Sequence, residues 1–118
     1  MSLNQEESKF SFSVDSHKIR NFKDFKRLLE EGTVVCFSFG TVRFLKNDKA
    51  TLRVAISVSK KFSKKSSVRN RVKRKLIEFF RLSQHKLRGI DIWVYVRIWK
   101  DENEILKEIE EFTKNLIL

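Results

Sequence analysis

Proline is absent from this sequence of 118 residues, and there are only three glycines and one cysteine. The scarcity of proline and glycine excludes collagen-like chains and Gly- or Pro-rich low-complexity chains. The single cysteine, Cys36, excludes an internal disulfide and a multi-cysteine zinc site, and its apolar surroundings predict a buried thiol in a reducing cytoplasm. No apolar run approaches the roughly 18 residues of a membrane span, and the N-terminus is acidic at Glu6 and Glu7. We therefore expect a cytoplasmic protein with neither a secretory signal nor a membrane segment.

Acidic residues are also few, because 15 Asp or Glu stand against 26 Lys or Arg, for a net charge of +11. The excess lies between Lys60 and Arg81, where ten basic residues accompany one acid, Glu78, for a net charge of +9. A solvated helix face would carry acidic partners four residues away, and here they are missing. A membrane-surface helix would need a free apolar face, which this segment needs for its core. The segment therefore predicts a nucleic acid partner rather than a membrane.

Hydrophobic periodicity predicts a single α+β domain with a four-stranded sheet. The expected order is helix, strand, strand, strand, helix, strand, helix, at about 22–31, 33–39, 41–45, 52–58, 66–81, 90–99 and 105–117. Asn21 should cap the first helix and Gly32 end it, and Ser66 or Ser67 should cap the second helix. The first three strands are expected to form an antiparallel meander, and a strand–helix–strand crossover to add the fourth strand parallel to a neighbour. Residues 1–17 show no sustained period and are expected to be a flexible arm before the domain at 18–118.

The last predicted strand carries an aromatic face that alternates with an apolar row. Its members are Trp93, Tyr95, Arg97 and Trp99. Aromatic rings and Arg on a sheet stack unpaired bases and hold their phosphates in many single-strand binders. Small side chains on a neighbouring strand, at Ala55, Ser57 and Ser59, would leave space for a groove. The alternative is that the rings pack beneath a helix as ordinary core, and the pattern leaves both interpretations open.

Side chains that would give the protein its own catalytic chemistry are scarce. The two histidines, His17 and His85, are the candidates for a nucleolytic pair. The aspartates are scattered, and neither a Cys/His metal spacing nor a Gly-rich phosphate loop is present. We expect no catalytic and no metal-binding residue in the protein, and a nuclease that uses the histidines is the alternative.

The segment from Ser57 to Lys61, the basic loop after it, and the run Arg69-Asn70-Arg71-Val72-Lys73-Arg74 closely resemble the signature of the bacterial ribonuclease P protein subunit. The resemblance continues through residues 78–81 and 89–94. Upstream, Lys18-Ile19-Arg20, Asp24-Phe25 and Gly32 are similar to the family's opening helix. The whole resemblance extends from about Lys18 to Leu116, nearly the entire predicted domain.

The resemblance implies a ribonucleoprotein that removes the 5′ leader of precursor tRNA. Its catalytic RNA would carry the endonucleolytic chemistry with Mg²⁺, and the protein alone would bind no cofactor. The implied partners are that RNA and precursor tRNA, and the protein alone is expected to be a monomer. The family fold also has an unusual left-handed strand–helix–strand crossover. A generic RNA-binding or ribosome-associated module without a role in cleavage is the alternative function.

Two sets of candidate site residues follow from the charge pattern and the resemblance together. The RNA-binding set is Lys60, Lys61, Lys64, Lys65, Arg69, Asn70, Arg71, Lys73, Arg74 and Arg81. The leader-binding set is Phe25, Leu29, Lys60, Lys61, Trp93, Tyr95 and Arg97. Several positions depart from the family pattern, among them the residue after Arg97, where the family's usual proline is missing. Ile77 stands where Arg is common and should expose an apolar side chain, Leu29 replaces a common aromatic, and Ala55 replaces a frequent Gly.

Overall fold

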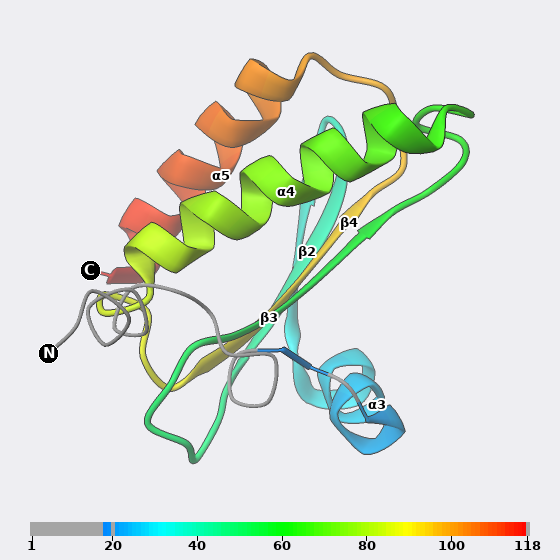
Figure 1. The fold of residues 1–118 in the computed structure, drawn as a ribbon. Helices are drawn as coiled ribbons and strands as arrows, with labels where there is room; N and C mark the ends of the chain where they lie inside the picture. The colour runs from blue at the N-terminus through cyan, green and yellow to red at the C-terminus, as the bar shows by residue number, and fades with distance from the viewer. Residues whose placement is uncertain (1–17, 20, 118) are drawn as a thin grey trace, which may run out of the picture.

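The structure, a computed structural model, describes residues 18–19 and 21–117, so the arm predicted at residues 1–17 lies outside the described residues. Within the described residues, seven elements follow one another in the predicted order (Figure 1). They are α3 (Phe22–Glu31), β1 (Thr33–Phe37), β2 (Gly40–Lys46), β3 (Arg53–Val58), α4 (Ser66–Ser83), β4 (Ile90–Val96) and α5 (Glu102–Ile117). The predicted class, a single α+β domain, is confirmed.

The four strands form one mixed sheet in the order β1-β2-β4-β3. β4 pairs antiparallel with β2 and parallel with β3, so the expected parallel pairing of the last strand is confirmed. The expected meander of the first three strands is wrong, because β4 lies between β2 and β3. The inward side chains Ile92, Val94 and Val96 of β4 are fully buried, and so apolar a strand is stabilised most at the centre of a sheet. In Figure 1 the two long helices lie above the sheet and β3 lies nearer the viewer than β4, so the β3–α4–β4 crossover is left-handed.

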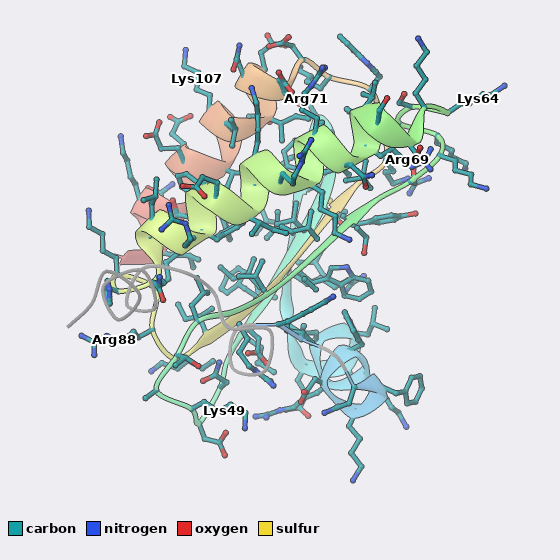
Figure 2. The ribbon with its side chains drawn as sticks, viewed as in Figure 1. Lys49, Lys64, Arg69, Arg71, Arg88 and Lys107 are labelled. Carbon is teal, nitrogen blue, oxygen red and sulfur yellow. The ribbon has the colours of Figure 1, made fainter. Side chains whose placement is uncertain are left out.

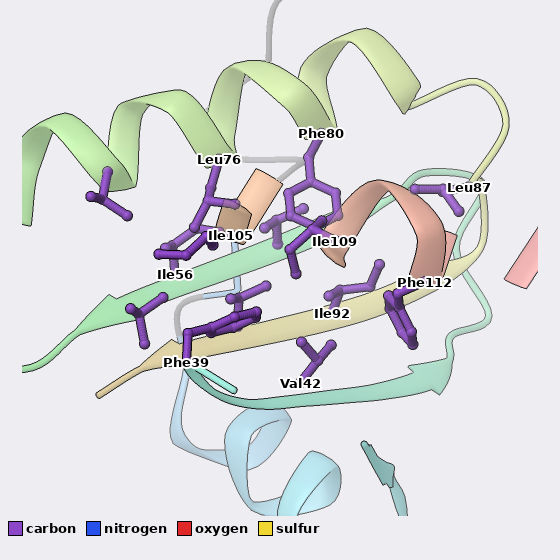
Figure 3. Close-up of a cluster of buried hydrophobic side chains, with 14 of the residues drawn as sticks. Phe39, Val42, Ile56, Leu76, Phe80, Leu87, Ile92, Ile105, Ile109 and Phe112 are labelled. Atoms are coloured by element: carbon purple, nitrogen blue, oxygen red, sulfur yellow. The ribbon is translucent and has the colours of Figure 1, made fainter. Parts of the chain in front are cut away.

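The hydrophobic core lies between the sheet and the helices α4 and α5 (Figure 3). Leu76 and Phe80 of α4 and Ile105 and Ile109 of α5 are almost completely buried against the sheet. Full burial of one such side chain contributes about 1.5–3 kcal/mol. This packing fixes α4 on one face of the sheet and leaves the opposite side of the helix to solvent. Among the described residues, no helix has the length and apolar character needed to cross a membrane.

The short helix α3 lies on the other face of the sheet (Figure 1). It begins as predicted, because Asn21 Oδ1 accepts a hydrogen bond from the backbone N–H of Asp24 at 2.9 Å. It also ends as predicted at Gly32, where a Cβ atom would lie 2.5 Å from the carbonyl oxygen of Leu28. Leu28 is fully buried and anchors the helix.

Three local predictions are wrong. β4 ends at Val96 rather than at Trp99, because the N–H groups of Arg97 and Ile98 both donate to the carbonyl oxygen of Phe39 at 2.9 Å. The cap of α4 is Lys65, which makes no side-chain cap hydrogen bond, and the predicted cap residues 66 and 67 belong to the helix itself. Cys36 is exposed rather than buried, because β1 is an edge strand and Cys36 lies on the opposite side from its core-facing neighbours.

Candidate RNA-binding surfaces

The loop between β3 and α4 presents four lysines to solvent. They are Lys60, Lys61, Lys64 and Lys65. Phe62 anchors this loop, because its side chain is buried and its ring stacks on the exposed Trp99 with centroids 6.4 Å apart. Arg69 in the first turn of α4 is half-buried and donates from Nη1 to the carbonyl oxygen of Ser63 at 2.9 Å. The loop backbone is therefore fastened to the helix while its lysine side chains remain in solvent.

The outer face of α4 continues this positive charge, and Figure 2 shows Arg71 of α4 pointing away from the sheet. Asn70, Arg71, Lys73 and Arg74 are exposed, as predicted. The 18 residues of α4 span about 27 Å, so these groups lie along a rigid rod. Planar guanidinium groups bind phosphate in a bidentate manner, and Lys adds mobile point charges. We call the four loop lysines together with residues 69–71, 73 and 74 the basic surface.

An acidic residue from a distant part of the chain meets the basic surface. Glu102, the first residue of α5, accepts hydrogen bonds from Lys75 Nζ at 2.9 Å and from Arg71 Nε at 3.1 Å. The hydrogen bond from Lys75, with that from Arg71, lowers the pKa of the Glu102 carboxyl group, which is therefore ionised at neutral pH. The sequence pattern missed this partner because Glu102 lies outside the basic segment. Arg71 retains its two Nη groups for a further partner.

The basic surface ends at Arg74, in the third turn of α4. Arg81 forms an ion pair with Glu78, and their hydrogen bond lowers the pKa of Glu78 and raises the pKa of Arg81. Ile77 was expected to be exposed, but it is partly buried and packs against the core. The loop lysines, Lys73 and Arg74 form no ion pair with any residue in 18–19 or 21–117.

The opposite face of the sheet carries a hollow of about 450 Å³ beside α3. Its lining is Leu29, Thr41, Arg43, Ser57, Trp93 and Tyr95. The strand register explains this set, because Thr41, Tyr95 and Ser57 form one row across β2, β4 and β3, and Arg43, Trp93 and Ala55 form the next. Of the small side chains predicted beside the aromatic rings, Ala55 and Ser57 pair with Trp93 and Tyr95, whereas Ser59 lies beyond the end of β3. We call this site the sheet hollow.

The aromatic wall of the sheet hollow is held in place by two contacts. Trp93 Nε1 donates to Ser57 Oγ at 3.1 Å, and the Trp93 ring meets Phe25 of α3 edge to face, with centroids 4.9 Å apart. Tyr95 is partly exposed beside it. Arg97 and Trp99, expected on the same face, lie beyond the end of β4 and do not line the hollow. Sequence reasoning missed Thr41 and Arg43, although alternation with the buried Val42 along β2 places them on this face.

A buried charge network joins α3 to the sheet at the end of the same face. Arg53 donates from Nε and Nη2 to the two carboxylate oxygens of Asp91 at 2.9 and 2.7 Å, and from Nη1 to Asp24 of α3 at 3.0 Å. Asn47 donates to Asp91 Oδ1 at 2.7 Å. Arg53 and Asp91 lie on the same strand faces as Ser57 and Trp93, at even spacings. The network therefore sets the position of the helix that carries Phe25 and Leu29.

The candidate histidine pair stays a prediction, because His17 lies outside the described residues and only His85, which is exposed, belongs to them. No group of three or more His, Cys, Asp or Glu side chains that could hold a metal ion occurs within residues 18–19 and 21–117. The chemistry that the two surfaces support is binding of a phosphate backbone and of unpaired bases.

Comparison with known proteins identifies the family of this chain. The family model described as Ribonuclease P matches residues 14–117 of this chain. The ribonuclease P protein component of Caldanaerobacter subterraneus is 40% identical over 101 residues, which cover 82% of this chain and 86% of that protein. The protein of the same name from Pseudoalteromonas translucida is 36% identical over 92 residues, which cover 78% of this chain and 63% of that protein. The structure of the Staphylococcus aureus RNase P protein matches with a TM-score of 0.75 at 27% identity, over 86% of this chain and 95% of that one. This chain belongs to the ribonuclease P protein family.

Proposed function

We propose that this protein binds the catalytic RNA of ribonuclease P and the single-stranded 5′ leader of precursor tRNA, and so promotes maturation of tRNA 5′ ends. One observation supports this proposal most strongly. The basic surface and the sheet hollow lie on opposite faces of one sheet. Lys60 and Lys61 follow Ser59 just past the end of β3, which is an edge strand of that sheet. A protein with this arrangement can hold a folded RNA on one side and a single strand on the other.

The basic surface is suited to a structured RNA. Its cations lie along a loop and a rigid helix, at positions fixed by Phe62, Arg69 and the core packing of α4. Each Lys or Arg that neutralises a phosphate releases counterions, so affinity should fall steeply with salt concentration. The contacts are to the backbone, and shape rather than base sequence selects the RNA.

The sheet hollow is suited to an extended single strand. Trp93 and Tyr95 offer ring faces or edges for unpaired bases, and Arg43, in the same row as Trp93, can meet a phosphate. The volume, about 450 Å³, is within the range of small-ligand sites. Stacking is tolerant of sequence because every base has an aromatic face, and this suits a leader that differs from one tRNA to another.

The hydrolytic chemistry belongs in this proposal to the RNA and its Mg²⁺ ions. Mg²⁺ held by that RNA would supply an activated water and stabilise negative charge at the phosphodiester that is cleaved. The side chains of the protein bind and orient the two RNA segments, and the exposed cations lower the repulsion between their phosphates.

Reconstitution tests the proposal directly. The protein is mixed with a bacterial ribonuclease P RNA and a precursor tRNA at low Mg²⁺ concentration, and mature 5′ ends are measured over time. We expect the protein to increase the rate of cleavage well above that of the RNA alone. RNA binding without faster cleavage would support the generic RNA-binding module instead. Cleavage by the protein alone, abolished in a His17→Ala/His85→Ala variant, would support a protein-only nuclease.

A further inference from the structure

A second hollow, of about 740 Å³, lies between α4 and α5, on the far side of the sheet from the sheet hollow. Phe79 of α4 and Leu106 of α5 form its apolar floor, and both are partly buried against the core. Asn103, in the first turn of α5, stands at its edge with an exposed amide group. We call this site the interhelical groove.

The charges around the interhelical groove are of two kinds. Arg71 and Lys75 also border it, but Glu102 engages both. Arg74 of α4 and Lys107 of α5 border it as well, and neither forms an ion pair within residues 18–19 and 21–117. Figure 2 shows Lys107 and Arg71 extending into solvent from the two helices.

Two carboxylates also border the groove. Glu78 is held by Arg81, and Glu110 is exposed on α5. The groove therefore combines an apolar floor, one uncompensated cation on each wall, and amide and carboxylate groups able to hydrogen-bond a base edge.

We propose that the interhelical groove binds one unpaired nucleotide of an RNA, with its base on Phe79 and Leu106 and its phosphate between Arg74 and Lys107. This inference rests on the proposed function, because Arg74 belongs to the basic surface and brings the RNA backbone alongside the groove. The volume of about 740 Å³ admits a nucleotide, since small-ligand sites commonly measure 300–1,000 Å³. The bound RNA would thus be recognised by a base turned out of its helix as well as by its phosphates.

The composition of the groove favours a nucleotide over a protein segment. A docked amphipathic helix requires a row of apolar contacts at i, i+3, i+4 and i+7, whereas two apolar side chains line this groove. The cations on its walls match a phosphate, and the aromatic ring and apolar side chain of its floor match a base. We therefore expect an acidic peptide to bind this groove less tightly than a nucleotide, because only two apolar side chains would contact the peptide.

The first test compares two charge reversals on the same helix. Lys107→Glu removes the groove cation of α5, and Lys114→Glu makes the same change of charge seven residues later, at an exposed position outside the groove. Affinity for a bacterial ribonuclease P RNA is measured by filter binding at one salt concentration. We expect Lys107→Glu to weaken binding by about tenfold more than Lys114→Glu, because only Lys107 loses a direct, charge-assisted phosphate contact. If both variants weaken binding equally, Lys107 acts only through long-range electrostatic attraction and makes no direct phosphate contact, and the proposal is overturned.

The second test uses small probes and does not depend on any ribonuclease P RNA. Adenosine monophosphate and inorganic phosphate are titrated separately into the isotopically labelled protein, and amide and methyl resonances are followed by NMR. The nucleotide should shift Phe79, Asn103 and Leu106 as well as the wall cations, whereas phosphate should shift the walls alone. No nucleotide-specific shift on the floor would overturn the proposal, and the groove would then be open to a protein partner. If cleavage is stimulated and both groove tests fail, the proposed function stands without this site.

Discussion

Both side chains of the Arg53–Asp91 ion pair are buried. Breaking this pair should therefore lower the free energy of unfolding far more than breaking a surface ion pair does. The side chains are 10% and 7% exposed, and two hydrogen bonds of 2.7 and 2.9 Å join them. The hydrogen bonds that Arg53 donates to Asp91 raise the pKa of the Arg53 guanidinium above its ordinary high value, so the group stays charged. The substitution Asp91→Ala therefore leaves a buried cation with Asp24 as its remaining carboxylate.

The expected size of this loss follows from the geometry. Removing one partner of a buried pair costs about 3–5 kcal/mol. Asp24 still accepts a hydrogen bond from Arg53 Nη1 at 3.0 Å, so we expect Asp91→Ala to lower the free energy of unfolding by about 3 kcal/mol, the lower end of this range. The total free energy of unfolding of such a domain is of the order of 5–15 kcal/mol. The double variant Arg53→Met/Asp91→Leu removes both charges, and we expect it to recover about half of the loss or more.

Urea unfolding followed by tryptophan fluorescence provides the measurement, with a constant m-value as the check that a single transition is compared. Arg27→Gln on α3 is the matched control, since its partner Glu31 is 3.9 Å away and both side chains are about half exposed or more. That change should cost less than about 0.5 kcal/mol. The reasoning is refuted if Asp91→Ala costs no more than Arg27→Gln, or if the double variant is less stable than the single one.

Three further predictions concern the two RNA-binding surfaces. The lowered pKa of Glu102 means that its ion pairs stabilise the fold at neutral pH and that this contribution disappears as the pH falls through the lowered value. Glu102→Gln should therefore reduce the free energy of unfolding by about 1 kcal/mol or less at pH 7 and leave it unchanged in strong acid, and an equal loss at both pH values would contradict this. Arg74→Ala should weaken RNA binding and reduce the slope of log affinity against log salt by about one counterion, and an unchanged slope would show that Arg74 touches no phosphate. Phe25→Ala should impair binding of precursor tRNA with a long leader more than binding of mature tRNA, whereas Phe22→Ala, at a side chain 78% exposed on the same helix, should affect neither. Equal effects of Phe25→Ala on both substrates would remove Phe25 from leader recognition.

Local signals in the sequence predicted most of the elements and the two candidate surfaces. Asn21 and Gly32 mark the ends of α3 because a cap and a stop act within one turn of the chain. Alternation along β4 predicted that Trp93 and Tyr95 share a face, because side chains in a strand alternate whatever the neighbouring strands are. The basic surface could likewise be predicted from the sequence, because its residues are close together in the chain.

The features that the sequence did not reveal depend on contacts between distant residues. The insertion of β4 between β2 and β3 is decided by which strand is buried most, and no local pattern encodes that comparison. The carbonyl oxygen of Phe39 ends β4 from more than fifty residues away, which removes Arg97 and Trp99 from the aromatic face. Glu102 meets Arg71 only once α5 has packed beside α4.

Because α4 and the sheet hollow lie on opposite faces, the sheet separates the two candidate RNA-binding surfaces. In the proposed complex, the sheet and the side chains packed on it would hold a folded RNA and a single strand apart. Packed layers of secondary structure lie about 10 Å from one another. That distance is set by buried residues such as Leu76 and Ile92, which touch no RNA. In that complex, the thickness of the core would set the distance between the two RNA segments and so the position of the cleavage site along the precursor.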